Sequence, residues 1–202
     1  MKDKLLIIGA GGHGRVVADI AEAMGRYKEI AFVDDGTIEK TPRFPVIGKT
    51  SLLAEKKDEY ELFVAIGNAQ VRKRIMESTE AEFATLIHPS AIIGSNVTIG
   101  KGTVLMPGAI VNTGAIIGNG VILNTASSVD HDCVVDDYCH VAVGAHLCGN
   151  VKVKEGTWIG AGATIIQGIN ICGACMIGAG AVVVKPVEET GTYTGVPARK
   201  KV

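Results

Sequence analysis

The stretch IHPSAIIGSNVTIGKGTVLMPGAIV (residues 87–111) places Ile, Leu or Val at every sixth position, and the pattern continues unbroken to Val183. A period of six fits neither the 3.6-residue turn of a helix nor the two-residue alternation of a single strand. It is typical of a short strand and a turn, repeated as the chain coils about an axis. With three hexads to a triangular turn, we expect about five and a half stacked turns of parallel β-helix. The residues in phase are Ile87, Ile93, Ile99, Leu105, Val111, Ile117, Leu123, Val129, Val135, Val141, Leu147, Val153, Ile159, Ile165, Ile171, Ile177 and Val183.

The hexad pattern also predicts which side chains face inward. The first residue of each hexad should point into the coil, and the fifth, as at Ala109 and Ala145, should be a small inward neighbour. Glycine recurs at the second and fourth positions, where we expect turns that need positive φ.

The five cysteines follow the same repeat. Cys133, Cys139 and Cys175 occupy fifth positions and are predicted to be small buried fillers. Cys172 and Cys175 form a CxxC motif, which elsewhere binds zinc or carries out redox chemistry. Because Cys175 keeps the phase of the repeat, we expect no metal site here.

The N-terminal part has a different pattern, with buried strands alternating with helices. A glycine-rich turn, residues 9–14, joins the first strand to the first helix. We predict a half-size doubly wound α/β domain over residues 1–82 and the β-helix with a C-terminal tail over residues 83–202. The predicted strands are 5–8, 30–33 and 62–66, and the predicted helices are 15–24 and a second through 72–77.

Composition narrows the class of protein. The net charge is −1, which gives no reason to expect nucleic-acid binding. The first ten residues lack the long apolar run of a signal peptide, so we expect a cytoplasmic protein. Residues 156–184 carry no charge and are long enough to cross a bilayer. The unbroken six-residue phase through this stretch favours β-coils and no membrane insertion.

The hexads, together with Gly195-Val196-Pro197-Ala198, resemble the hexapeptide-repeat acyltransferases. The N-terminal motifs resemble one subfamily, the bacterial sugar acetyltransferases, which includes UDP-4-amino-sugar N-acetyltransferases and sialic acid O-acetyltransferases. These motifs are GAGGHG (9–14), FVDD (32–35), AIGN (65–68) and VDHD (129–132). The resemblance implies a left-handed β-helix, a homotrimer and acetyl-CoA as co-substrate.

The glycine-rich turn has a phosphate-binding character of its own. Gly9-x-Gly11-x-x-Gly14 lets the backbone approach a pyrophosphate, and the following helix N-terminus favours negative charge. With Asp34 about twenty residues on, it also fits an NAD fingerprint, but some 80 residues hold only half of such a fold. The resemblance implies that a UDP-sugar contacts Gly12, His13, Gly14, Asp34, Asp35 and Gly67, and Arg15 could add positive charge.

Acetyl transfer to an amine needs a base, for which histidine is suited near neutral pH. His131, His140 and His146 are the candidates in the repeat. His131 lies at an outward third position between Asp130 and Asp132, and a carboxylate can orient its ring.

The resemblance makes His131 the base, with Asp132 where close relatives are expected to carry glutamate, and places His140 near the acetyl-CoA thioester. It further implies acetyl-CoA contacts at Gly149, Ala161 and Ala179, with Arg199 or Lys200 near the phosphates. With no persuasive nucleophile beside these histidines, we expect direct transfer without an acyl-enzyme.

The preferred function is therefore N-acetylation of the 4-amino group of a UDP-linked amino-dideoxy sugar. The alternatives are O-acetylation of sialic acid or a related sugar, a noncatalytic β-solenoid scaffold, and an NAD-dependent oxidoreductase.

Overall fold

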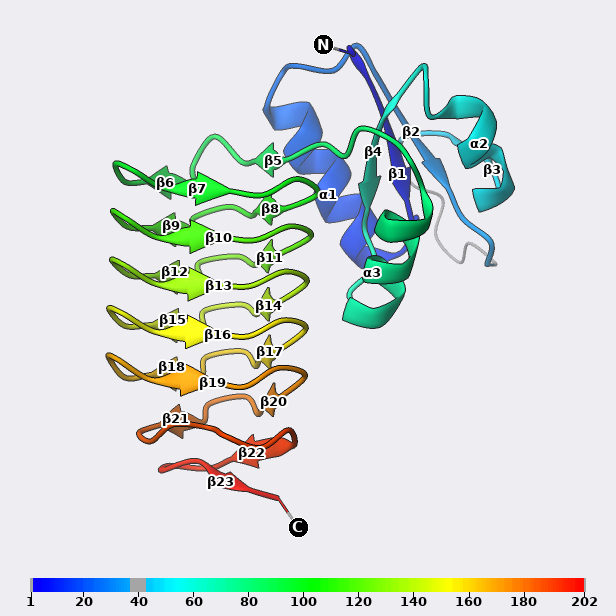
Figure 1. Ribbon diagram of the computed structural model, residues 1–202. Helices are drawn as coiled ribbons and strands as arrows, with labels where there is room; N and C mark the ends of the chain where they lie inside the picture. Colours follow the sequence, from blue (N-terminus) through cyan, green and yellow to red (C-terminus); the bar gives the residue numbers. More distant parts are fainter. Residues whose placement is uncertain (1, 37–42, 202) are drawn as a thin grey trace.

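The computed structural model describes residues 2–36 and 43–201, which form an α/β unit followed by a long coil of parallel strands (Figure 1). The α/β unit contains one parallel sheet in the order β3-β2-β1-β4. The first helix begins at Gly12, three residues earlier than predicted, and β3, η1 and α2 were not predicted. The elements are β1 (Lys4–Ile8), α1 (Gly12–Ala23), β2 (Glu29–Val33), β3 (Val46–Gly48), the short helix η1 (Thr50–Leu52), α2 (Leu53–Lys56), β4 (Glu61–Val64) and α3 (Ala69–Ser78).

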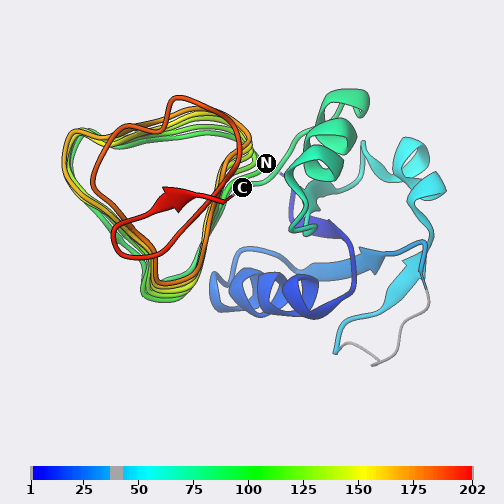
Figure 2. The same cartoon turned by 90° about the horizontal axis from the view of Figure 1, so that it is seen from below.

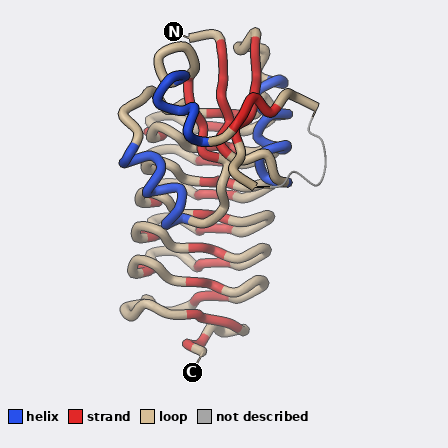
Figure 3. Tube along the Cα trace, turned by 90° about the vertical axis from the view of Figure 1, so that its right-hand side faces the viewer, coloured by secondary structure: helices blue, strands red, loops and turns tan. Residues whose placement is uncertain are grey.

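Helices cover both faces of this sheet (Figure 3). Side chains alternate between the faces along a strand, so Leu5 and Ile7 of β1 pack in the core that contains Val17 and Ile20 of α1. Leu6 and Ile8 belong to the opposite core, to which α2 and α3 contribute. The uninterrupted apolar run of β1 is what a strand buried on both faces requires.

The β-helix consists of two-residue strands that stack in three parallel sheets. Each strand pairs with the strand 18 residues later, as Ile122 does with His140, so three hexads make one coil as predicted. Seen along the axis, the coils superimpose as a triangle (Figure 2). The strands are β5 (Leu86–Ile87), β6 (Ile92–Ile93), β7 (Thr98–Ile99), β8 (Val104–Leu105), β9 (Ile110–Val111), β10 (Ile116–Ile117), β11 (Ile122–Leu123), β12 (Ser128–Val129), β13 (Val134–Val135), β14 (His140–Val141), β15 (His146–Leu147), β16 (Lys152–Val153), β17 (Trp158–Ile159), β18 (Thr164–Ile165), β19 (Asn170–Ile171), β20 (Met176–Ile177) and β21 (Val182–Val183), followed by β22 (Thr192–Thr194) and β23 (Arg199–Lys200).

Glycine is required at the second and fourth hexad positions for two different reasons. This corrects the prediction that both positions need positive φ. Fourth-position residues are left-handed, for example Gly102 with φ 68° and Gly120 with φ 60°. The second-position glycines are absent from the positive-φ residues. They are small because the coils lie close: a Cβ on Gly100 would lie 2.5 Å from the carbonyl carbon of Gly118 in the next coil.

The predicted interior is confirmed from Leu105 onward, whereas in the first coil Ile87 and Ile99 are only partly buried and Ile93 is 40% exposed, because β5, β6 and β7 are the end strands of their sheets. Residues such as Val129 and Leu147 of the first position, Ala145 of the fifth position, and the cysteines Cys133 and Cys139 are buried in one continuous core. The charge-free stretch 156–184 forms β17 to β21. Within residues 2–36 and 43–201, no helix is both long and apolar enough to span a bilayer.

The α/β unit packs against one sheet of the β-helix, which we call the domain face: strands β5, β8, β11, β14, β17 and β20 (Figure 2). Val104, Met106 and Ile122 from this side share a core with α1. The proposed division between residues 82 and 83 lies between α3 and β5, where Phe83 forms a bridge with Leu62.

Candidate active site

His131 lies in the turn between β12 and β13. This turn forms the corner of the triangular cross-section that points away from the α/β unit (Figures 1 and 2). We call the stacked turns 112–114, 130–132 and 148–150 the His131 edge. Asp132 occupies the left-handed fourth position with φ 58°, a conformation that Asp tolerates better than most residues. Its Oδ2 lies 2.8 Å from His131 Nδ1. Because a carboxylate accepts, Nδ1 carries the proton and Nε2 keeps its lone pair.

The carboxylate of Asp130 fixes the backbone at the same turn. Its Oδ1 accepts hydrogen bonds from the His131 amide and from Asn112 Nδ2, each at 2.8 Å. The hydrogen bond from Asn112, in the preceding coil, is the main reason that the pKa of Asp130 lies below its ordinary value. The hydrogen bond to Asp132 raises the pKa of His131, so the half-exposed imidazole can take up a proton near neutral pH.

Gly149 stacks directly on His131, one coil further along the chain. A Cβ at Gly149 would lie 2.5 Å from His131 Nε2, a contact closer than real side chains make. The absence of a side chain at the buried Gly149 therefore leaves room for the imidazole, which packs directly against the Gly149 backbone.

We predict that Gly149→Ala lowers by about 10²-fold any activity that depends on His131, because the added methyl group pushes the imidazole aside and displacements of this size can cost that much. Gly173→Ala is the matched control. Gly173 shares the third repeat position, but its Cβ would meet Glu155 O at 3.1 Å and no histidine. Steady-state kinetics of the two variants, with circular dichroism to check folding, measure the difference; equal activities would contradict this role of Gly149.

The glycine-rich turn at the carboxyl end of β1 combines packing with open space. A Cβ on Gly14 would lie 1.9 Å from Gly9 O, so Gly14 is needed for the close approach of α1 to the turn. Gly12 has only the end of the Arg15 side chain at 4.0 Å, and Gly67 has nothing within 4 Å. Since α1 begins at Gly12, its first unpaired amides lie at this turn, as anion binding requires.

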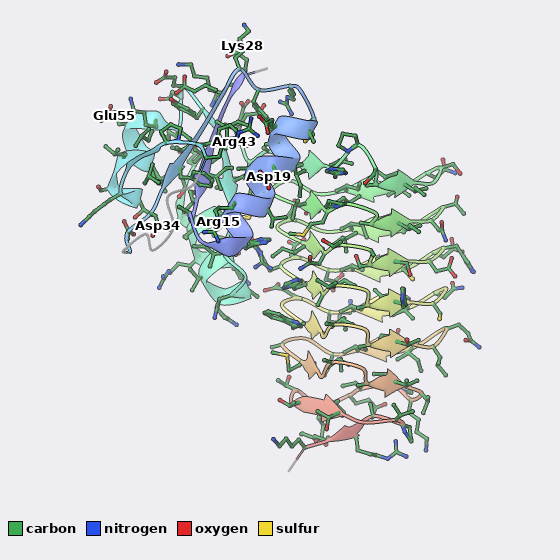
Figure 4. All side chains as sticks on the ribbon, turned by 180° about the vertical axis from the view of Figure 1, so that it is seen from behind. Arg15, Asp19, Lys28, Asp34, Arg43 and Glu55 are labelled. Atoms are coloured by element: carbon green, nitrogen blue, oxygen red, sulfur yellow. The ribbon has the colours of Figure 1, made fainter. Side chains whose placement is uncertain are left out.

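Asp34 and Asp35 lie at the same end of the sheet, and hydrogen bonds from other segments of the α/β unit hold both carboxylates in place. Asp34 Oδ2 accepts from the Ala10 amide at 2.7 Å, which ties β2 to the glycine-rich turn. Asp35 accepts from the amide and hydroxyl of Thr50. Figure 4 shows Arg15 and Asp34 at the same end of the α/β unit. A cleft of about 550 Å³ opens here, and its lining includes Gly9, Gly11, Asp34, Asp35, Ile66 and Arg74.

His13, which is half-buried, and His140, which is buried, lie at the junction of the two parts rather than at the His131 edge. Burial, with a smaller contribution from the nearby Arg72 cation, lowers the pKa of His13 to about 4 and that of His140 to about 3. Both rings are therefore neutral at pH 7. His140 Nε2 accepts from Asn124 Nδ2 at 3.0 Å, and its ring lies 4.4 Å from that of Trp158.

Each of these histidines has one buried ring nitrogen without a protein partner among the described residues, Nε2 in His13 and Nδ1 in His140. Buried polar atoms are normally satisfied. The two free ring nitrogens therefore indicate that the junction accommodates a polar ligand group or water.

Arg72 joins the two parts and was not singled out by the sequence. The side chain is fully buried, and its guanidinium donates to carbonyls on both sides of the junction. Nε and Nη2 reach Gly120 O and Tyr138 O of the β-helix at 2.6 and 2.7 Å. Nη1 reaches Ile66 O at 2.8 Å and Gly67 O at 3.1 Å, directly behind the predicted substrate loop.

The predicted acetyl-CoA contacts occupy two different edges of the triangle. Gly149 belongs to the His131 edge, whereas the exposed Ala161 and Ala179 occupy third positions of the turns that follow β17 and β20. Arg199 lies exposed on β23, where its Nη1 donates to Ala198 O.

A mononucleotide-sized α/β domain joined to a β-helix that bears an aspartate-held histidine defines a hexapeptide-repeat transferase. The family models agree: residues 4–79 match the PglD N-terminal domain and residues 90–125 match the bacterial transferase hexapeptide of six repeats. The chain belongs to the family of hexapeptide-repeat sugar acetyltransferases with this N-terminal domain. The predicted fold class is thereby confirmed. Membership of this enzyme family also rules out the two alternative functions, a noncatalytic scaffold and an NAD-dependent oxidoreductase.

Solved structures resemble the chain over its whole length. The acetyltransferase domain of PglB from Neisseria gonorrhoeae FA1090 is 41% identical with a TM-score of 0.96, and the match covers 99% of this chain and 100% of that one. A second structure of that domain is in complex with acetyl coenzyme A. PerB from Caulobacter crescentus, in complex with CoA and GDP-perosamine, is 33% identical with a TM-score of 0.92, over 98% of this chain and 97% of that one.

A curated relative matches over a shorter segment. UDP-N-acetylbacillosamine N-acetyltransferase from Bacillus subtilis (strain 168) is 36% identical over 105 residues. The match covers 48% of this chain and about half, 48%, of that relative.

Proposed function

We propose that this sugar acetyltransferase transfers the acetyl group of acetyl-CoA to the 4-amino group of a UDP-linked amino-dideoxy sugar, with His131 as the general base. The observation that carries the proposal is the His131–Asp132 pair, whose Nδ1 to Oδ2 distance is 2.8 Å and whose Nε2 faces the bare backbone of Gly149. The relatives are named as acting on, or bound to, nucleotide sugars and CoA.

In the proposed reaction, His131 Nε2 removes a proton from the amine as the nitrogen attacks the thioester carbonyl. Asp132 holds the ring in the tautomer that accepts this proton and stabilises the imidazolium that forms. Collapse of the tetrahedral intermediate breaks the carbon–sulfur bond, and the imidazolium returns its proton to the departing CoA thiolate. The small exposed residues Ala161 and Ala179 leave room for the pantetheine arm, and Arg199 supplies a cation for the CoA phosphates.

The acceptor is assigned to the cleft at the glycine-rich turn. The open space at Gly12 and Gly67 and the amides at the start of α1 suit a diphosphate. Asp34 and Asp35 lie on the wall of the cleft and supply acceptors for hydroxyl or base N–H groups. His13, neutral and with a free Nε2, faces the junction beside this loop.

The two halves of this site lie on different sides of one chain. The α/β unit packs on the domain face, whereas the His131 edge lies opposite it (Figure 2). We therefore propose a homotrimer in which the His131 edge of one subunit meets the α/β unit of its neighbour. Closed cyclic assemblies are a common form for identical subunits.

Release of CoA thiol tests the acceptor class. A panel of UDP- and GDP-linked 4-amino sugars and the matching hydroxyl sugars should give turnover with an amino acceptor. Turnover confined to hydroxyl acceptors would contradict N-acetylation, and turnover confined to the GDP series would contradict the uridine assignment.

Mixed oligomers test the shared site. His131→Asn removes the base, and Gly67→Leu places a large side chain in the open space proposed for the acceptor, where a Cβ meets no protein atom within 4 Å. Subunits carrying one change each, dissociated and reassembled together, should regain activity well above that of either variant alone. A mixture that stays as inactive as its components would contradict a site shared between subunits.

Asp132→Asn should shift the pH profile. The base must be neutral to act, so kcat rises with pH through the His131 pKa. Asp132 raises that pKa, so its loss should move the rise to lower pH while also lowering the plateau, because the ring is less well oriented. Asp136→Asn, which alters a carboxylate 3.2 Å from Lys154 on the next turn, is the control. An unchanged midpoint in Asp132→Asn would contradict the assignment.

A further inference from the structure

The CxxC motif, which the proposed transfer reaction does not use, lies in the turn between β19 and β20 near the C-terminal end of the β-helix (Figure 1). Both cysteines are free thiols, and their sulfur atoms lie 3.4 Å apart. Cys175 is 2% exposed, whereas Cys172 is only partly buried. One thiol is therefore accessible from solvent and the other lies directly behind it.

The backbone brings the two cysteines to the two ends of one tight turn. Cys172 and Cys175 are the first and last residues of a β-turn, whose end Cα atoms lie within about 7 Å, close to the usual span for a disulfide. The buried hydroxyl of Thr157 holds both ends, donating to Cys172 O at 3.0 Å and accepting from the Cys175 amide at 3.2 Å. Thr157 and the turn therefore keep the two thiols next to each other before any oxidation.

We propose that Cys172 and Cys175 are a reversible thiol–disulfide modification site that reacts with a small-molecule disulfide such as oxidised glutathione. Cys172 Sγ, as the thiolate, attacks one sulfur of the reagent, forming a mixed disulfide and releasing one thiol. Cys175 Sγ then loses its proton and attacks Cys172 Sγ, forming the intramolecular bond and releasing the second thiol. Two protein thiols are oxidised, and one disulfide is reduced to two thiols.

The order of the two steps follows from the surroundings. Burial raises the pKa of Cys175 to about 11, so this thiol is protonated and shielded when the reagent arrives. The more exposed Cys172 meets the reagent first. The Lys200 cation, whose Nζ donates to Glu189 Oε2 at 2.7 Å, offsets only a small part of this rise.

The chain contains a matched internal control. Cys148 occupies the same second hexad position as Cys172, with comparable partial exposure, but the fifth position of its turn is Val151. The turn of Cys148 therefore supplies no second thiol of its own, and the nearby Cys133, whose Sγ lies 3.1 Å from Cys148 O, belongs to the preceding coil. Cys175→Val recreates this arrangement at the CxxC turn.

The test is incubation of the folded protein with oxidised glutathione, followed by acid quenching, alkylation of the remaining thiols and peptide mass spectrometry. The wild type should lose three of its five alkylatable thiols: Cys148 as a mixed disulfide with glutathione, and Cys172 and Cys175 as a cross-linked peptide that dithiothreitol reverses. Cys175→Val should instead retain one glutathione on Cys172.

Two results would overturn the proposal: full alkylation of Cys172 and Cys175 in excess oxidised glutathione, or a glutathione that persists on Cys172 of the wild type. The readout is independent of acetyl transfer, so it stands apart from the proposed function.

Discussion

Replacing His131 with asparagine should lower kcat for acetyl transfer by about 10²- to 10⁴-fold, the usual contribution of a positioned general base. Asparagine keeps a polar group of similar size next to Asp132 but cannot take the proton from the amine. The KM values for both substrates should change little, because the side chain acts on the proton in transfer. Steady-state measurement of CoA release, with saturating acetyl-CoA and amino sugar, gives this split directly.

His146→Asn is the matched control. His146 lies exposed on β15, one coil beyond Ser128, whose hydroxyl lies 2.8 Å from its Nδ1. No carboxylate holds this ring among the described contacts, so the variant should keep wild-type kcat within a few-fold. Comparable losses in both variants, or an active His131→Asn enzyme, would remove His131 from the role of base.

Replacing Arg72 with methionine should lower the free energy of unfolding by about 3 kcal/mol or more, since buried acceptors left unpaired each cost on the order of 1–3 kcal/mol. The four carbonyls that lose their donor belong to Ile66, Gly67, Gly120 and Tyr138. For a domain of this size the melting temperature should fall by roughly 6–12 °C. Urea unfolding and thermal melts measure the loss.

Arg74→Met is the control for Arg72. Arg74 lies on the same helix with its side chain exposed, so its replacement should change stability by less than about 0.5 kcal/mol. Arg72→Lys should recover only part of the stability, because an ammonium lacks the planar fork that reaches four carbonyls. Equal melting temperatures for Arg72→Met and the wild type would contradict this account of the junction.

The β-helix could be predicted almost completely from the sequence because its contacts repeat. Each coil presents the same inward positions, and the partner of any residue lies 18 positions away. The His131–Asp132 pair could be predicted for a simpler reason, because the two residues are adjacent in the chain. The second-position glycines were misinterpreted because the close approach of successive coils, rather than a positive φ, requires glycine there.

The junction could not be predicted, because its contacts join residues with no fixed spacing. Arg72 binds carbonyls 48 and 66 residues away, and His140 is buried by a domain that begins at the other end of the chain. A weak signal existed: Arg72 precedes the apolar Met76 by one helical turn, on the face of α3 that packs inward. The contact between Gly149 and the His131 ring could also have been predicted, because Gly149 lies 18 residues after His131.

The 18-residue stacking makes the coil a unit of length that evolution or design can add or remove. A whole extra coil inserted after Gly168 would lengthen the molecule while leaving every edge in line. An insertion of six residues between His131 and Gly149 would turn the rest of the chain by one face and carry Gly149 away from the imidazole. We therefore expect the His131 site to tolerate insertions only as whole 18-residue coils, and to tolerate no insertion between His131 and Gly149.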